Sequence, residues 1–212
     1  MCAIFGARKY VDFMRLYQQN RERGDFAFGA VFIGTAPQII KTPGTYSGKL
    51  RGDFGYFIGH TQAPTSAVQT YNPQTSHPFV CGDWVVAHNG VLTNYTELAA
   101  EIENKSTYNE VDSSLIPALL TQRTSNNLDE PTLIASVMAS LRGTYTCWLF
   151  NQKTKNLYIA RCGSTLWVSE DQVSSTEIPE GESFPEGGIA CITEGKLQQV
   201  NTFTPASPFF IL

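Results

Sequence analysis

The chain opens with Met1-Cys2-Ala3-Ile4-Phe5-Gly6, in which a cysteine directly follows the initiator methionine and precedes a short apolar run. If Met1 is removed, Cys2 becomes the first residue and carries a thiol and a free α-amine together. Because these groups have ordinary pKa values of about 8.5 and about 8, the amine can accept the thiol proton near neutral pH. The stretch therefore predicts either an N-terminal nucleophile or a small buried cysteine that opens a strand.

The composition predicts one folded domain spanning residues 1–212. Hydrophobic residues make up 42% of the 212 residues and aromatic residues 12%, which is typical of a globular protein. The net charge is −4 and no block of basic residues occurs, so we expect no nucleic-acid partner and no membrane partner. The N-terminus shows no cationic region followed by an apolar stretch, so we expect a soluble, cytoplasmic protein.

The cysteines and histidines give no sign of a disulfide framework or a metal site. The five cysteines are scattered, odd in number and never in a CxxC pair. The three histidines have no partner at metal-ligand spacing. No nucleotide-binding motif is present either. We therefore expect no metal and no cofactor.

Hydrophobic periodicity predicts an α+β fold with mainly antiparallel sheets, because strands, then helices, then strands follow without a βαβ rhythm. An amphipathic helix is expected from Tyr10 to near Gly24, and Asp129-Glu130-Pro131 should begin another that runs through Leu141. Asn89-Gly90 follows a predicted strand directly, and Asn94 to Glu97 read as the capping box of a further helix. The expected strands cover 26–33, 38–41, 56–61, 78–81, 84–88, 144–150, 157–161, 165–168, 188–193 and 197–203.

Several short blocks follow Cys2 in a fixed order. They are Arg23-Gly24-Asp25-Phe26-Ala27-Phe28-Gly29, Gly59-His60-Thr61-Gln62-Ala63-Pro64-Thr65, Ser76-His77-Pro78-Phe79, Ala87-His88-Asn89-Gly90-Val91-Leu92-Thr93-Asn94, Val111-Asp112-Ser113 and Tyr158-Ile159-Ala160-Arg161. In order and spacing the chain resembles class II (N-terminal nucleophile, Ntn) glutamine amidotransferase domains over essentially its whole length. The resemblance implies a four-layer αββα sandwich of two mainly antiparallel sheets flanked by helices.

The resemblance also implies a reaction and the residues that perform it. Cys2 would attack the side-chain amide of L-glutamine and give glutamate and ammonia through a thioester. The side-chain amide of Asn89 and the backbone N–H of Gly90 would form the oxyanion hole, and Asp112 would hold the α-ammonium of glutamine. Read from the residues alone, Asn89-Gly90 is equally a hairpin turn and Asp112 a helix N-cap.

Two further residues, His77 and Arg23, each allow two interpretations. His77 is a structural hydrogen-bonding histidine or a general base, and the structural role is favoured because the α-amine already supplies a base. Arg23 either holds the loop around Cys2 at the substrate site or is an exposed arginine at a helix end.

One position departs from the family pattern. Gln62 stands where the family has an arginine that pairs with the α-carboxylate of glutamine, and a neutral amide offers neither the charge nor the bidentate fork. Ala63 also replaces an aromatic residue. Three explanations are open. Thr65, Ser66 and backbone amides bind the α-carboxylate in place of the missing arginine, or Arg8 or Arg51 reaches the site, or the substrate is not free glutamine.

The leading hypothesis is therefore a glutaminase that passes ammonia to a synthetase on another chain. The first alternative is an Ntn amidohydrolase that acts on a γ-glutamyl or other amide substrate. The second is a catalytically silent regulatory homologue.

Overall fold

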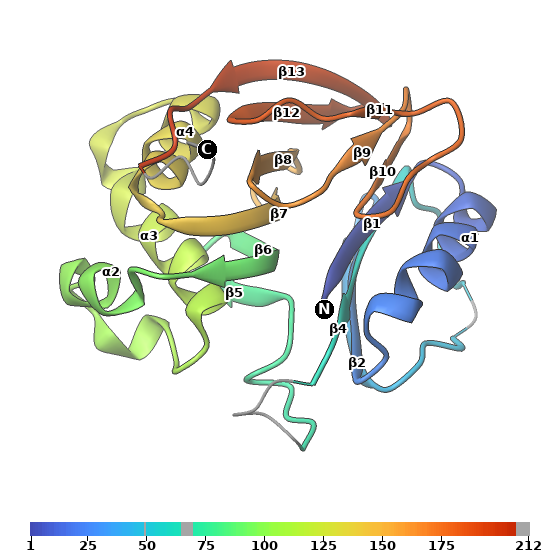
Figure 1. Cartoon of the computed structure of the whole chain (residues 1–212), viewed down its shortest axis with the longest axis horizontal. Coiled ribbons are helices and arrows are strands. Elements are labelled where there is room, and N and C mark those ends of the chain that lie inside the picture. Colours follow the sequence, from blue (N-terminus) through green and yellow to red (C-terminus); the bar gives the residue numbers. More distant parts are fainter. Residues whose placement is uncertain (49, 65–69, 207–212) are drawn as a thin grey trace, which may run out of the picture.

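The computed structural model describes residues 1–48, 50–64 and 70–206. Two β-sheets face each other, with helix α1 outside one sheet and helices α2, α3 and α4 outside the other (Figure 1). Every pair of neighbouring strands is antiparallel. The αββα sandwich predicted from the sequence is confirmed.

The first sheet contains the strand that directly follows Cys2. Its seven strands have the order β11-β9-β10-β1-β4-β2-β3. Their bounds are β1 Ala3–Ala7, β2 Ala27–Ile33, β3 Gln38–Pro43, β4 Tyr56–Gln62, β9 Trp167–Val168, β10 Gln172–Ser174 and β11 Glu182–Ser183. Strand β1 lies between β4 and β10, so the N-terminus leaves from the middle of the sheet rather than from an edge.

The second sheet has six strands in the order β13-β12-β8-β7-β6-β5. Their bounds are β5 Phe79–Cys81, β6 Trp84–Leu92, β7 Gly143–Asn151, β8 Leu157–Cys162, β12 Gly188–Thr193 and β13 Lys196–Thr202. The hairpin between β12 and β13 turns at Glu194 and Gly195, which both have positive φ, as the predicted glycine turn requires.

The helices are α1 Tyr10–Asn20, α2 Tyr95–Glu101, α3 Leu115–Arg123 and α4 Glu130–Ser140, with short 3₁₀ turns at Arg21–Arg23, Lys105–Thr107, Asp112–Ser114 and Thr124–Asn126. Asp129 caps α4, because its side chain accepts the Thr132 N–H, as predicted. Among the described residues, none of the helices has both the length and the apolar character that crossing a bilayer requires.

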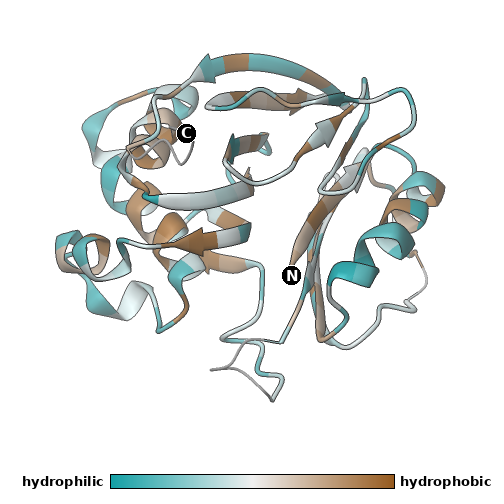
Figure 2. Ribbon diagram, viewed as in Figure 1, coloured by the Kyte–Doolittle hydropathy of each residue, from teal (hydrophilic) through white to brown (hydrophobic). Residues whose placement is uncertain are grey.

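Side chains alternate between two apolar layers along each inner strand. Ile4 faces the layer between the sheets, whereas Phe5 faces α1 and packs against Phe13. The central strand β1 is drawn largely in hydrophobic colours in Figure 2. A hydrogen bond from Trp148 Nε1 on β7 to the Gly59 carbonyl on β4, over 3.1 Å, crosses the inner layer. Burial of both faces fixes the register of β1 and hence the position of Cys2.

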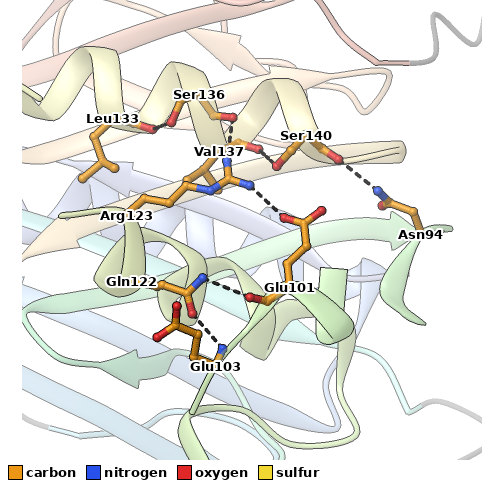
Figure 3. Close-up of polar contacts among 9 residues, drawn as sticks. All are labelled: Asn94, Glu101, Glu103, Gln122, Arg123, Leu133, Ser136, Val137 and Ser140. Atoms are coloured by element: carbon orange, nitrogen blue, oxygen red, sulfur yellow. Dashed lines mark hydrogen bonds and ion pairs between the residues drawn. The ribbon is translucent and has the colours of Figure 1, made fainter. Parts of the chain in front are cut away.

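Polar contacts join the three helices that cover the second sheet (Figure 3). Arg123 on α3 donates to the Ser136 carbonyl on α4 and pairs with Glu101 on α2 over 3.2 Å. Gln122 bonds to the backbone of Glu101 and Glu103. These contacts hold the layer behind β6, the strand that carries Asn89 and Gly90.

Two local predictions at this end of β6 are wrong. The strand does not end before Asn89 but continues to Leu92, because Asn89 and Gly90 pair with Thr146 and Tyr145 of β7. The capping box does not form either. The side chain of Asn94 instead accepts the Arg142 N–H and donates to the Ser140 carbonyl, a tertiary contact that local sequence does not reveal.

Candidate active site

Cys2 lies just before β1, where the N-terminus opens between the two sheets (Figure 1). Arg23 holds its backbone: Nε donates to the Cys2 carbonyl over 3.1 Å and a terminal nitrogen donates to the Ser175 carbonyl over 3.4 Å. Met1 is 82% exposed, and its amine donates to the Arg23 carbonyl over 2.8 Å. The first peptide bond is thus close to the surface while the thiol beside it is largely enclosed.

Burial raises the pKa of the Cys2 thiol above its ordinary value, and nearby Asp112 adds to the increase. A hydrogen bond from the Ala63 backbone, the positive N-terminus and Arg23 lower the same pKa, but they do not outweigh burial. The resting thiol is therefore protonated at neutral pH and needs a base before it can act as a nucleophile.

The thiol opens onto a cavity of about 260 Å³. The described residues with polar or ionisable groups around it are Cys2, Gln62, Thr75, His77, His88, Glu110, Asp112 and Ser113, together with the Gly90 backbone. These residues come from five separate parts of the chain: the N-terminus, the end of β4, the loop before β5, strand β6, and the segment before α3. The fold therefore joins the blocks that the sequence analysis singled out.

Asn89 and Gly90 lie on β6, and Gly90 lines this cavity. Gly90 has φ +151°, and a Cβ there would come within 1.8 Å of the Thr144 carbonyl oxygen, so only glycine fits. The buried Asn89 side chain donates from Nδ2 to Ser175 Oγ over 3.4 Å. Each amide nitrogen carries two hydrogens, so a second Asn89 donor remains.

Asp112 begins the 3₁₀ turn before α3 and is half-buried. One carboxylate oxygen accepts the Leu92 N–H over 2.9 Å, and the other accepts the Ser113 N–H over 2.7 Å. The Ser113 hydroxyl lies 3.3 Å from that second oxygen. A carboxylate offers about four acceptor positions, so capacity for one ligand hydrogen bond remains.

Three buried histidines cluster at the cavity, and two of them, His77 and His88, line it. The His60 and His77 rings stack with centroids 4.0 Å apart, and His60 Nε2 donates to the His88 carbonyl over 3.1 Å. Burial lowers the pKa of all three, that of His60 to about 3 and that of His77 well below its ordinary value. For His88 the Asp112 carboxylate opposes this effect. The cluster is therefore uncharged near neutral pH.

Gln62 is only 4% exposed, and its side chain is turned onto His77. Its Oε1 accepts the His77 backbone N–H over 3.3 Å and lies 3.4 Å from His77 Nδ1. Gln62, the residue that differs from the family pattern, is thus bound to His77 of the histidine cluster.

The two arginines suggested as substitutes lie elsewhere. Arg8 follows β1 at the end opposite to Cys2, about 20 Å away at the usual rise per residue of a strand. It lines a separate cavity of about 410 Å³. The Arg51 carbonyl accepts from Gln38, at the end of the sheet remote from Gln62. Neither arginine reaches the candidate site, so that suggestion is wrong. Thr65 and Ser66 lie outside the described residues.

Sequence reasoning missed Ser175 and Glu110. Ser175 accepts the Ile4 N–H on its hydroxyl over 2.9 Å and follows β10, a strand too short to show periodicity. Glu110 precedes Asp112 by two residues, in the bend before the 3₁₀ turn, and both residues line the cavity. That spacing is visible in the sequence. Among the described residues, no three His, Cys, Asp or Glu side chains form a metal-binding group.

Comparison with known proteins gives concordant results at the levels of sequence and fold. A family model described as a glutamine amidotransferase domain matches residues 65–165. The glutamine–fructose-6-phosphate aminotransferase of Francisella tularensis is 29% identical over 161 residues, which cover 70% of this chain. The enzyme of the same name from Staphylococcus epidermidis is 32% identical over 113 residues, or 52% of this chain.

The glutamine phosphoribosylpyrophosphate amidotransferase of B. subtilis superposes on 96% of this chain with a TM-score of 0.72 at 17% identity. The chain is thus similar to glutamine amidotransferases in part of its sequence and to class II members in its fold. A class-II glutamine aminotransferase domain protein of Silicibacter pomeroyi has the same fold, with a TM-score of 0.62 and 15% identity over 96% of this chain and all of that one.

The chain spans only part of the length of these relatives. The matched region spans 26% of the Francisella tularensis protein and 19% of the Staphylococcus epidermidis protein. The superposition covers 49% of the B. subtilis chain.

Proposed function

We propose that residues 1–212 form one glutaminase domain that hydrolyses the side-chain amide of a glutamine-type substrate and releases ammonia. One observation carries the proposal. The Cys2 thiol, the Gly90 backbone and the Asp112 carboxylate meet around one cavity of about 260 Å³, although they are far apart in the sequence. A nucleophile, an oxyanion donor and an ammonium acceptor are the groups that this hydrolysis requires.

Removal of Met1 supplies the base that the thiol lacks. The exposed Met1 is accessible to an aminopeptidase, and its loss leaves the α-amine on Cys2 itself. This amine takes the thiol proton as Sγ bonds to the amide carbon. The C–N bond then breaks and the same proton leaves with the nitrogen as ammonia. Water next attacks the thioester, restores the thiol and releases the acid product.

The negative oxygen that forms on the amide carbon is stabilised by the Gly90 N–H and by the second Nδ2 hydrogen of Asn89. The first Nδ2 hydrogen, bound to Ser175 Oγ, fixes the orientation of this amide. Loss of one such donor reduces kcat by roughly 10²–10³. Because Gly90 has no Cβ, β6 can lie close to the Thr144 carbonyl, and the Gly90 N–H can still donate to the substrate.

Asp112 binds the α-ammonium of the substrate through its remaining acceptor position. The released ammonia is passed to a synthetase on another chain. The names of the curated relatives, which are glutamine-dependent aminotransferases longer than this chain, support the idea of an ammonia-consuming partner.

Ammonia release by the purified protein tests the proposal. The chain with an N-terminal Cys2 should release ammonia from a side-chain amide and form a covalent adduct with a glutamine-like electrophile. Cys2→Ala should do neither. Full ammonia release by Cys2→Ala would refute the proposed nucleophile.

A second candidate keeps the chemistry but changes the leaving group. Ala63, directly after β4, takes the place of an aromatic residue of the family pattern, and we infer that its smaller side chain leaves more room beside Gln62 for a larger amide substrate. An amidohydrolase of γ-glutamyl amides would release an amine rather than ammonia from such substrates, and a panel of γ-glutamyl amides distinguishes the two. A silent regulatory homologue would not need to retain Cys2, Asn89, Gly90 and Asp112 together.

A further inference from the structure

The charges around the active-site cavity do not suit a free amino acid. Glu110 and Asp112 are the acidic side chains among the described residues that line the cavity, and none of those residues is an arginine or a lysine. His77 and His88 also line it, but burial keeps both uncharged near neutral pH. Residues 65–69, which the structure does not describe, are Thr-Ser-Ala-Val-Gln and carry no charged side chain. The α-carboxylate of free glutamine would thus meet two carboxylates and no side-chain cation.

The position that could supply a cation is occupied by Gln62, and its amide is already engaged. Its Oε1 accepts the His77 backbone N–H over 3.3 Å, so the side chain is held against the loop before β5. Within the described part of the chain the Gln62 NH₂ group donates to no recorded acceptor, and it has no charge. A neutral donor of this kind suits a carbonyl oxygen better than a carboxylate, which gains most from a charged, bidentate partner.

The guanidinium group of Arg23, which contacts the backbone of Cys2, is also unavailable to bind an α-carboxylate. Arg23 donates to the carbonyl oxygens of Cys2 and Ser175, and it does not line the cavity. Its charge therefore supports the backbone beside the nucleophile rather than the substrate.

We propose that the preferred substrate has an α-ammonium group but no free α-carboxylate, so that its α-carboxyl is part of an amide or a peptide bond. This inference rests on the proposed function. Asp112 binds the ammonium directly, and Glu110 adds negative charge at the same side of the cavity. The Gln62 NH₂ group donates to the neutral α-carbonyl oxygen. The exposed position of Glu110 shows that the cavity reaches the surface there, which leaves a path for the rest of a peptide.

The reaction at Cys2 is unchanged by this choice. Sγ bonds to the side-chain carbonyl carbon, the C–N bond to the side-chain nitrogen breaks, and ammonia leaves with the proton carried by the α-amine of Cys2. Water then cleaves the thioester. A glutamine residue at the N-terminus of a peptide becomes a glutamate residue, and the α-amide or peptide bond stays intact.

Three substrates tested on the processed protein decide the matter: L-glutamine, L-glutaminamide and the dipeptide Gln-Gly. Mass spectrometry of the products identifies which amide was cleaved. We expect kcat/KM for side-chain hydrolysis to be at least tenfold higher for L-glutaminamide than for L-glutamine. Preference for the dipeptide over L-glutaminamide would identify a peptide as the substrate, and the reverse would identify a small amide.

A variant that places a positive charge at position 62 provides a second test. Gln62→Arg should raise kcat/KM for L-glutamine at least tenfold and lower it for L-glutaminamide, whereas the matched control Gln199→Arg, on the exposed strand β13, should leave the ratio unchanged. Equal or better use of L-glutamine by the unmodified protein overturns this inference and leaves the proposed function intact. If none of the three substrates yields ammonia and Cys2 forms no covalent adduct, the proposed function itself fails.

Discussion

Ser175 Oγ lies 3.4 Å from Asn89 Nδ2 and 2.9 Å from the Ile4 backbone nitrogen, and both nitrogens donate to it. One hydroxyl thus connects the strand that follows the nucleophile to the amide proposed for the oxyanion hole. The Ser175 backbone N–H also donates to the Ile4 carbonyl over 2.8 Å. The two sheets are therefore held in register at the point where Cys2 and Asn89 must act on one carbonyl group.

Ser175→Ala should lower kcat about tenfold and leave KM nearly unchanged, because the Asn89 amide loses its orienting partner. The Ile4 N–H would lose a buried acceptor, which costs about 1–3 kcal/mol of unfolding free energy. Steady-state kinetics and urea unfolding measure the two effects. The control Ser125→Ala, at an exposed turn, should change neither. An unchanged kcat in Ser175→Ala would show that Asn89 does not depend on this contact.

Gly90→Ala should abolish activity and destabilise the protein by roughly 3 kcal/mol or more, because the added Cβ would collide with the Thr144 carbonyl in a positive-φ region. Urea unfolding and ammonia release are the measurements. Gly55→Ala is the matched control, since a Cβ there meets only the Ile33 carbonyl at 4.0 Å. Gly90→Ala with normal stability and activity would contradict the described course of β6.

Asp112→Asn should raise KM by about a hundredfold, because a neutral amide cannot pair with an ammonium group. The variant should also lose about 1–2 kcal/mol of stability, since the Leu92 N–H and Ser113 N–H would compete for one remaining carbonyl oxygen. Steady-state kinetics give the KM. Asp83→Asn, in the exposed turn between β5 and β6, is the control and should leave KM unchanged. An effect on stability alone would reduce Asp112 to a helix cap.

Stability should fall as the pH is lowered from about 6.5 toward about 3. His60 has an ordinary pKa of 6.5, which burial lowers to about 3 in the folded protein. In that interval the unfolded chain binds a proton that the folded chain does not, so acid favours unfolding by up to about 1.4 kcal/mol per pH unit for this histidine. His60→Gln should therefore show a shallower decline in unfolding free energy between pH 7.5 and pH 5. Equal slopes would indicate that His60 is protonated in the fold.

Residue pattern alone predicted an α+β fold with mainly antiparallel sheets, whereas the four-layer arrangement was implied by the family resemblance. The structure shows the layers directly, since Ile4 and Phe5 alternate between two apolar clusters. The short strands β10 and β11 were not predicted, since two or three residues show no period. Asn94 was assigned to a helix cap because its competing partners, Arg142 and Ser140, lie more than forty positions away.

The same limits apply to the candidate site. The family resemblance drew attention to Cys2, Asn89, Gly90 and Asp112. Cys2, Gly90 and Asp112 line one cavity, and Asn89, next to Gly90 on β6, contacts Ser175. The contact between Gln62 and His77, and the role of Ser175 as a shared acceptor, depend on how distant loops meet. The residues next to Gln62 and Ser175 in the sequence do not indicate these contacts. Only the three-dimensional structure therefore shows that Gln62 is bound to His77.

The central claim is that Cys2 acts as a nucleophile only when its own α-amine is free. The direct test compares ammonia release by the processed chain with that of a chain bearing one additional N-terminal residue before Cys2, with intact mass confirming each N-terminus. The account predicts that the processed chain releases ammonia and that the extended chain, although equally stable, is inactive. Equal ammonia release by the extended chain would contradict it.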